Sequence, residues 1–252
     1  MHASSSSLHA SSTGLVSIFR RSEDIDLERV SSLSSCLYAL ALAQMLLYAL
    51  VLSVPDPPSN HDPALTAPLK ALPCATLCIN AALRYRLHRR NRFSLCLASA
   101  FVFHALGDAL LEFPPLFAAG LASFLIAHLL NLAAFASPAD ADFGDSDSIV
   151  AAAGDLLPRR PGPPLRLDLA LPFALYAAAL LALLFAAGTL ASDAALGACV
   201  AVYALALAAC PWRALVRARE PLPGDCATLW KIAAAGYCVY ALSDSLLAID
   251  RV

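Results

Sequence analysis

Charged residues are scarce in this chain: they make up 14% of its 252 residues, while apolar residues make up 60%. A soluble domain usually carries about 25% charged residues, because its surface has to face water. The scarcity is also uneven, since the charges collect in short islands between long runs rich in alanine and leucine. This composition excludes an ordinary soluble domain and indicates that most of the surface faces an apolar medium.

Other absences narrow the class further. The apolar runs do not alternate, and they are about twice as long as the roughly 10-residue strands of a membrane barrel. Because backbone groups in lipid must be satisfied internally, the runs are predicted to be helices. No internal repeat and no glycine-rich phosphate loop is visible, and none of the eight cysteines belongs to a CxxC pair. We therefore expect an all-α, polytopic transmembrane helix bundle in which the cysteines serve packing.

Seven stretches have the roughly 17–25 apolar residues that a ~30 Å hydrocarbon core requires. The second stretch is the least regular, because Pro68, Lys70 and Pro73 fall in its first half, although membrane helices tolerate proline. The predicted spans are Leu33–Val54, Ala64–Leu83, Phe93–Phe113, Leu116–Ala136, Leu169–Ala187, Ala194–Trp212 and Cys226–Ile249.

Lysine and arginine residues predict the orientation of these spans. Three precede the first span, five lie between spans two and three, three follow span four, and three follow span six. The alternate loops carry none, and only Arg251 falls on their side. This bias supports seven spans and a cytosolic N-terminus. We expect the five-arginine island to meet anionic lipid head groups and no nucleic acid, because it lies between two spans.

Two segments have the composition of solvated chain. Residues 1–32 are rich in serine and lack the apolar core of a secretory signal, so we expect a disordered cytosolic tail, with a transit peptide as the alternative. Residues 137–168 are acidic and then rich in proline and arginine, which predicts a cytosolic linker within one helical domain, 33–252. We expect the first span to act as the targeting signal and the protein to lie in the endoplasmic reticulum membrane, with a plastid membrane as the alternative.

Ionisable side chains within the spans are few, and each costs about 2.5–3.5 kcal/mol at the bilayer centre, so they are functional candidates. Lys70, Asp108 and Asp244 lie about five or six residues from the non-cytosolic ends of spans two, three and seven. At a helical rise of 1.5 Å per residue, they share a depth of about 8 Å. We expect these groups of opposite sign to share one hydrated pocket on the non-cytosolic side.

Helical spacing adds other polar side chains to this pocket. His104 and Glu112 flank the aspartate of span three at four-residue intervals on one helix face. Tyr240 shares a face with the aspartate of span seven, and Ser243 lies beside it. His128, near the middle of span four, is predicted to form the floor of the pocket. The alternative is that all these groups form interhelical hydrogen bonds that only hold the bundle together.

A metal site is the competing chemical interpretation. His104 and Asp108, four residues apart, can both ligate zinc, with His128 from the next span as a third ligand. Only two histidines lie within the spans, however, so we expect no metal and no other cofactor.

Three segments resemble the sequence motifs of one known protein family. The first is Lys70-Ala-Leu-Pro73, and the second runs from His104-Ala-Leu-Gly-Asp108 through Gly120 and Phe124 to His128 and Phe135. The third is Tyr240-Ala-Leu-Ser243-Asp244-Ser-Leu-Leu-Ala248. Together they cover spans two to seven, in the order found in the YhhN-type lysoplasmalogenase family, which the chain resembles.

The resemblance implies a hydrolase that cleaves the vinyl-ether bond of a lysophospholipid, the lysoplasmalogen, into a fatty aldehyde and glycerophosphocholine or glycerophosphoethanolamine. Vinyl ethers open by protonation of the β-carbon, and a neutral carboxylic acid can supply that proton. We place Asp108 and Asp244 in the roles of acid and cation-stabilising carboxylate, in either order. Lys70 would bind the phosphate or tune the pair, and His128 would orient a carboxylate or the water. The set of substrate-binding candidates is completed by His104, Tyr240 and Ser243.

The chain departs from the family at Asn131, where tyrosine is usual, at His104, where serine is common, and at Asp250, where asparagine is frequent. Family members also usually carry an eighth helix after the point at which this chain ends, so we expect an exposed partner face on span seven and a form that can lack activity. Two further functions stay open. One is a lipid-binding or transport protein that uses the same pocket without chemistry. The other is an enzyme that acts on a different lysolipid.

Overall fold

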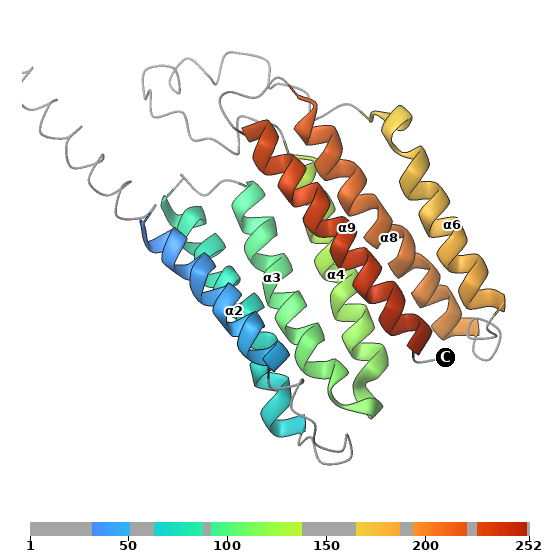
Figure 1. Cartoon of the computed structure of the whole chain (residues 1–252), viewed down its shortest axis with the longest axis horizontal. Coiled ribbons are helices and arrows are strands. Elements are labelled where there is room, and N and C mark those ends of the chain that lie inside the picture. Colours follow the sequence, from blue (N-terminus) through green and yellow to red (C-terminus); the bar gives the residue numbers. More distant parts are fainter. Residues whose placement is uncertain are drawn as a thin grey trace, which may run out of the picture.

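The computed structural model describes residues 32–50, 63–87, 92–137, 165–186, 194–220 and 226–250, which form an all-α bundle (Figure 1). The predicted fold class is therefore confirmed. Two predicted segments lie outside the described residues. They are residues 1–31 of the predicted tail and residues 138–164 of the predicted linker.

The helices begin and end close to the predicted span limits. They are Ser32–Leu50, α2 (Pro63–Leu87), α3 (Arg92–Leu111), α4 (Phe117–Phe135), α6 (Leu171–Ala186), α8 (Ala194–Ala218) and α9 (Cys226–Asp250). Two short 3-10 turns, η2 (Pro114–Leu116) and η4 (Leu167–Leu169), precede α4 and α6. The second predicted span is a continuous helix through both Pro68 and Pro73.

Five helices of the described chain are long and apolar enough to cross a membrane, and the shorter apolar α6 and the 25-residue α9 complete the bundle. The five are Ser32–Leu50, Pro63–Arg86, Arg92–Leu111, Pro114–Phe135 and Gly197–Ala218. Their outward faces expose large apolar side chains: Leu42 is 58% exposed, and Phe185 and Val239 are each 69% exposed. Because lipid, unlike water, solvates such faces, the chain is an integral multi-pass membrane protein.

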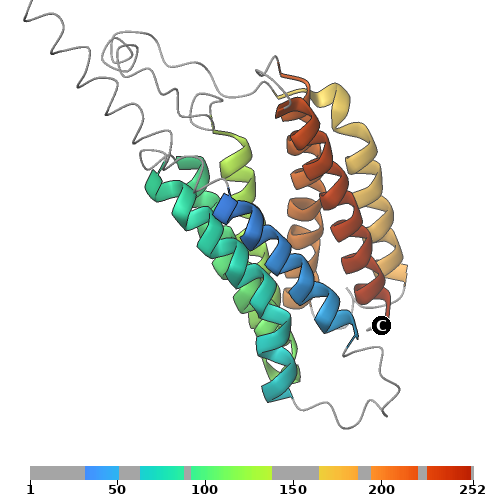
Figure 2. The same cartoon turned by 60° about the vertical axis from the view of Figure 1, so that its left-hand side comes forward.

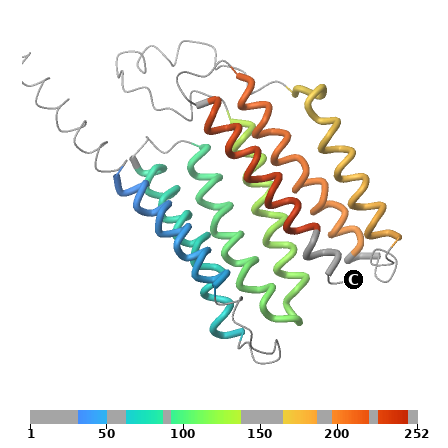
Figure 3. Tube along the Cα trace, viewed as in Figure 1, coloured from blue at the N-terminus to red at the C-terminus, as the bar shows by residue number. Residues whose placement is uncertain are grey.

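Consecutive helices run up and down the bundle, as the Cα trace shows (Figure 3). α2 packs on α3, α3 on α4, and α4 on α8, which also contacts α6 and α9. The Ser32–Leu50 helix lies outside this group, against α2 (Figure 2), with hydrogen bonds from Ser34 to Asn80 (2.8 Å) and from Thr76 to Gln44 (2.9 Å). α9 thus ends at the same end of the bundle as the α3–α4 turn (Figure 1).

The main apolar core lies where the C-terminal ends of α4 and α8 meet the N-terminal half of α9. Small side chains dominate it and let the helices approach closely. Its larger members are aromatic, and the rings of Phe135 and Trp230 meet edge to face with centroids 5.3 Å apart. The buried residues of this cluster are Ala134, Phe135, Cys210, Ala214, Ala218, Trp230 and Ala234.

The predicted end of the sixth span, Trp212, is wrong, because α8 continues to Ala218. Arg213 and Arg217 were predicted to lie in a cytosolic loop, but both are buried residues of this helix. The helix of the second span likewise continues past the predicted end at Leu83, to Leu87.

The contacts of Arg217 explain why the helix continues. Its guanidinium donates to the carbonyl oxygen of Ser137 and to Glu220 (2.9 Å), and it lies 5.5 Å from the ring centroid of Trp230. The cation is therefore neutralised and hydrogen-bonded inside the bundle, which removes the usual reason for a span to end before an arginine.

Two glycines let α3 and α4 approach closely. A Cβ on Gly107 would lie 2.9 Å from the ring of Phe124, and one on Gly120 would lie 2.8 Å from the side chain of Leu111. The ring of Phe124 is buried and packs in turn against His104, with centroids 5.6 Å apart. These contacts explain why both motif positions are glycine.

Gly107→Ala is expected to destabilise the folded protein by about 1–3 kcal/mol, because the stiff Phe124 ring has to move. The gain in helix propensity, about 1 kcal/mol, is too small to reverse this. Thermal unfolding of the purified protein in detergent measures the effect. Gly236→Ala is the matched control, since nothing lies within 4 Å of its added Cβ. An unfolding temperature of the Gly107 variant at or above that of the control would contradict the close packing.

Candidate functional site

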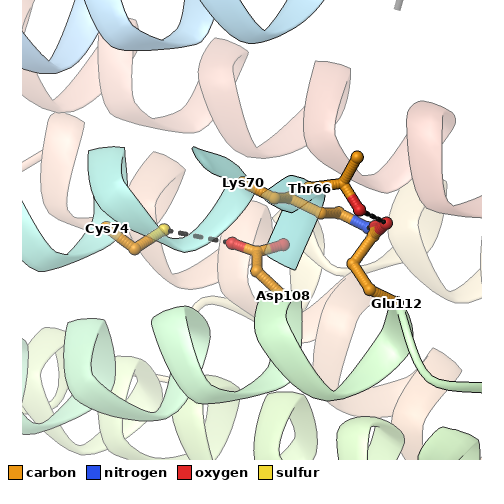
Figure 4. Close-up of polar contacts among 5 residues, drawn as sticks. All are labelled: Thr66, Lys70, Cys74, Asp108 and Glu112. Atoms are coloured by element: carbon orange, nitrogen blue, oxygen red, sulfur yellow. Dashed lines mark hydrogen bonds and ion pairs between the residues drawn. The ribbon is translucent and has the colours of Figure 1, made fainter. Parts of the chain in front are cut away.

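A polar network joins α2 to the C-terminal end of α3 (Figure 4). Thr66, Lys70 and Cys74 recur every four residues on one face of α2. Glu112 accepts hydrogen bonds from Oγ1 of Thr66 (2.8 Å) and from Nζ of Lys70 (3.0 Å). One turn earlier, Oδ2 of Asp108 lies 3.5 Å from Sγ of Cys74, which donates to it. Asp108 of α3 and Glu112, which directly follows this helix, thus each have a hydrogen-bond donor on α2.

A third carboxyl group, that of Asp244, reaches the same region from α9. The hydroxyl group of Tyr203, on α8, donates a hydrogen bond to Oδ2 of Asp244. The hydroxyl groups of Tyr203 and Tyr240 are also hydrogen-bonded to each other. Asp108 and Asp244 lie within electrostatic range of each other, and both are within range of Lys70. The two carboxyl groups are partly buried, so an apolar surrounding strengthens every charge interaction there.

Two buried histidines pack beside these carboxyl groups. The rings of His104 and His128 meet edge to face, with centroids 5.3 Å apart, and the ring of Tyr240 lies 5.9 Å from the first and 5.7 Å from the second. The amide nitrogen of Asn131 lies 3.2 Å from Nε2 of His104, which makes that ring nitrogen the acceptor. The proton of a neutral His104 is then on Nδ1.

His128 is completely buried. Its Nδ1 lies 3.7 Å from Sγ of Cys210, and the ring of Tyr203 lies 5.4 Å from its own ring. Within the described part of the chain, Nε2 of His128 has no hydrogen-bond partner. Buried polar atoms are usually paired, so this nitrogen is suited to receive a polar group that enters the site.

Most of the residues predicted for the pocket converge in space. Ser243 does not, because it is exposed on α9. The buried serine of this motif is instead Ser245, whose hydroxyl group bonds to that of Tyr176 on α6. The predicted residues that do converge are Lys70, His104, Asp108, His128, Tyr240 and Asp244.

Sequence reasoning missed several members of the network, among them Tyr203 and Cys74. Tyr203 is a lone tyrosine in an Ala/Leu-rich run, and no spacing within α8 connects it with the aspartate of α9. Cys74 was assigned to packing, but its thiol bonds to Asp108. Lys70 was predicted to bind phosphate or tune the aspartates; its ammonium group forms an ion pair with Glu112 and also lies within electrostatic range of both aspartates. The four-residue spacing of Thr66, Lys70 and Cys74 was the sequence feature that could have placed these three side chains on one face of the helix.

The geometry does not favour the zinc interpretation. No group of three histidine, cysteine, aspartate or glutamate side chains in the described ranges is arranged to hold a metal ion. His104 and His128 turn one ring nitrogen each toward Asn131 and Cys210.

The network lies away from the basic end of the bundle. The arginines of the described residues gather where α2 and α8 end and α3 begins, whereas the network includes the C-terminal parts of α3 and α9 (Figure 1). This placement agrees with the matched depths of the pocket residues along their helices.

Comparison with protein families gives one match, to the model described as the YhhN family, over residues 65–252. Comparisons with curated proteins and with solved structures gave no match. The matched region contains every residue of the network except Tyr48 on the Ser32–Leu50 helix, which hydrogen-bonds to Glu112. Since the match covers well over half of the chain, the protein belongs to the YhhN family.

Proposed function

We propose that this protein is a membrane hydrolase that cleaves the vinyl-ether bond of lysoplasmalogens to a fatty aldehyde and glycerophosphocholine or glycerophosphoethanolamine. The observation that carries the proposal is the meeting of Asp108 and Asp244 from two helices, beside buried histidine and tyrosine side chains, inside an apolar bundle. Family membership supports the same reaction class. The endoplasmic reticulum is the membrane that we propose for it.

The reaction needs a proton donor and an anion at one place. Protonation of the β-carbon of the vinyl ether gives an oxocarbenium ion, which a water molecule then captures. One carboxyl group can deliver the proton, and the other can stabilise the cation and accept a proton from the water, as paired carboxyl groups do in glycoside hydrolysis. The partly apolar surroundings of Asp108 and Asp244 strengthen both effects.

The remaining side chains suit an amphiphilic lysolipid. Lys70 offers a cation that can exchange its partner Glu112 for a phosphate group of the substrate. Nε2 of His128 offers a buried ring nitrogen for the attacking water. His104 and Tyr240 would form the wall between these two groups.

The test is aldehyde release by the purified full chain in detergent, coupled to an aldehyde dehydrogenase. The substrate is lysoplasmenylethanolamine or lysoplasmenylcholine, and the matched control lipids are the saturated 1-alkyl ether and the 1-acyl ester with the same head group. We expect aldehyde from the vinyl ethers alone, because only they can form the oxocarbenium ion by protonation of carbon. Saturable lipid binding without any aldehyde would contradict the proposal and favour the lipid-binding or transport function.

A further inference from the structure

We propose that Tyr203 is a positioning residue that keeps Asp244 ionised, so that Asp108 carries the proton delivered to the substrate. This assignment rests on the proposed function for its chemical meaning. The location of the proton itself is a property of the resting protein and can be measured without turnover.

The two aspartates have donors of different strength. Oδ2 of Asp244 accepts from the phenolic hydroxyl group of Tyr203, which is itself hydrogen-bonded to Tyr240. Hydrogen bonds of this kind to an ionised acceptor are about twice as strong as neutral ones, and a chain of them polarises its members. Asp108 has the thiol of Cys74 at 3.5 Å, and a thiol is a weak donor. The stronger donor therefore favours the carboxylate form of Asp244.

The charges around the two aspartates point the same way. Asp108 lies within electrostatic range of two other carboxyl groups, those of Asp244 and Glu112. Asp244 has the carboxyl group of Asp108 within this range, together with the cation of Lys70, and it accepts a hydrogen bond from Tyr203. The ammonium group of Lys70 is within range of both aspartates, but its nearest anion is Glu112, 3.0 Å away. Since neighbouring like charges in an apolar site do not both stay ionised, the proton belongs on Asp108.

The reaction then balances and returns both groups to their starting states. Asp108 gives its proton to the β-carbon, whose π electrons form the new C–H bond, and the α-carbon becomes the oxocarbenium ion. Water attacks this carbon while Asp244 takes a proton from the water, which gives a hemiacetal. Asp108 next removes the hemiacetal hydroxyl proton, the bond from carbon to the glycerol oxygen breaks, and Asp244 protonates that oxygen. The aldehyde and the glycerophospho compound leave.

Infrared difference spectra of the full-length protein in detergent near neutral pH locate the proton. We expect a carbonyl stretching band of a protonated carboxyl group in the wild type, lost in Asp108→Asn. The band should be retained in Asp244→Asn, because the partial burial of Asp108 and the nearby carboxylate of Glu112 still disfavour the charged form of Asp108. Loss of the band in the Asp244 variant instead, or the absence of such a band from the wild type, would overturn the assignment. This result does not depend on turnover, so an inactive protein with the expected band would contradict the proposed reaction and leave the assignment standing.

The pH profile of kcat/KM tests Tyr203. Tyr203→Phe removes one hydroxyl group that stabilises the ionised form of Asp244, so the acidic limb is expected to move to higher pH by about one unit, with the alkaline limb unchanged. We expect kcat at neutral pH to fall about 10-fold and KM to change little.

Tyr176→Phe is the matched control, because Tyr176 also bonds to α9, at Ser245 and at the carbonyl oxygen of Ala241 (2.8 Å). We expect the control variant to leave both limbs where they are. An equal shift in both tyrosine variants would mean that loosening of α9 is the cause, and an unmoved acidic limb in Tyr203→Phe would mean that Tyr203 has no such role. Either result overturns the proposal.

Discussion

Asn in place of either Asp108 or Asp244 is expected to lower aldehyde release by about 10²- to 10⁴-fold, the usual contribution of a positioned acid or base. The amide keeps the size of the side chain but can neither deliver a proton nor stabilise a cation as an anion does. Each variant should stay folded, because asparagine can still accept from the hydroxyl group of Tyr203 at Asp244 or from the thiol of Cys74 at Asp108. The coupled aldehyde assay measures the loss.

Asp168→Asn is the matched control, since Asp168 is exposed and pairs with Arg166 outside the network (2.7 Å). Its aldehyde release should equal that of the wild type. Thermal unfolding and gel filtration in detergent show whether the network variants are folded. A folded Asp108 or Asp244 variant with full activity would contradict the assignment of these two residues as the acid and the cation-stabilising carboxylate. This conclusion would hold whatever activity the wild type shows on other lipids.

Arg217→Ala is expected to lower the free energy of unfolding by about 3–5 kcal/mol, the largest stability loss among the variants considered for this protein. Arg217 is 0% exposed, and its removal takes away a partner from Glu220 and from the carbonyl oxygen of Ser137. It also leaves an empty volume beside the ring of Trp230. Thermal unfolding in detergent measures the change, and aldehyde release per folded molecule should be retained, because the polar network lies elsewhere.

Two further substitutions show which property of Arg217 matters. Arg217→Lys keeps the charge but loses the planar fork that reaches two acceptors, so we expect an intermediate stability. Arg166→Ala removes an arginine of an exposed ion pair and should leave the unfolding temperature unchanged. If Arg217→Ala were as stable as Arg166→Ala, the buried contacts of Arg217 would contribute nothing to the fold.

The spans were predictable because the requirement behind them is local. A run of apolar residues in lipid has to satisfy its own backbone, and this fixes α3, α4 and α9 within a few residues of where they lie. The convergence of Lys70 with the two aspartates followed from equal depth along three helices, which sequence position alone supplies.

What the sequence could not supply depends on the rotation of one helix against another. Tyr203 and Asp244 lie on different helices, and only the packing of α8 on α9 brings the two side chains together. Ser243 was included because it neighbours Asp244 in the chain, yet a rotation of about 100° per residue puts it on the exposed face. Arg217 was read as a loop residue because its partners, Ser137 and Glu220, are not identifiable from hydropathy.

The hydrogen bonds that join the Ser32–Leu50 helix to α2 have a consequence for the order of assembly. Ser34 and Gln44 lie in a helix that is synthesised before α2, while their partners Asn80 and Thr76 belong to α2. Until α2 is made, both polar groups face lipid or water with no helical neighbour. Sliding of one helix past the other by a single turn would break both bonds at once. The two hydrogen bonds together therefore fix the height of the Ser32–Leu50 helix relative to α2 while the rest of the bundle forms against α2.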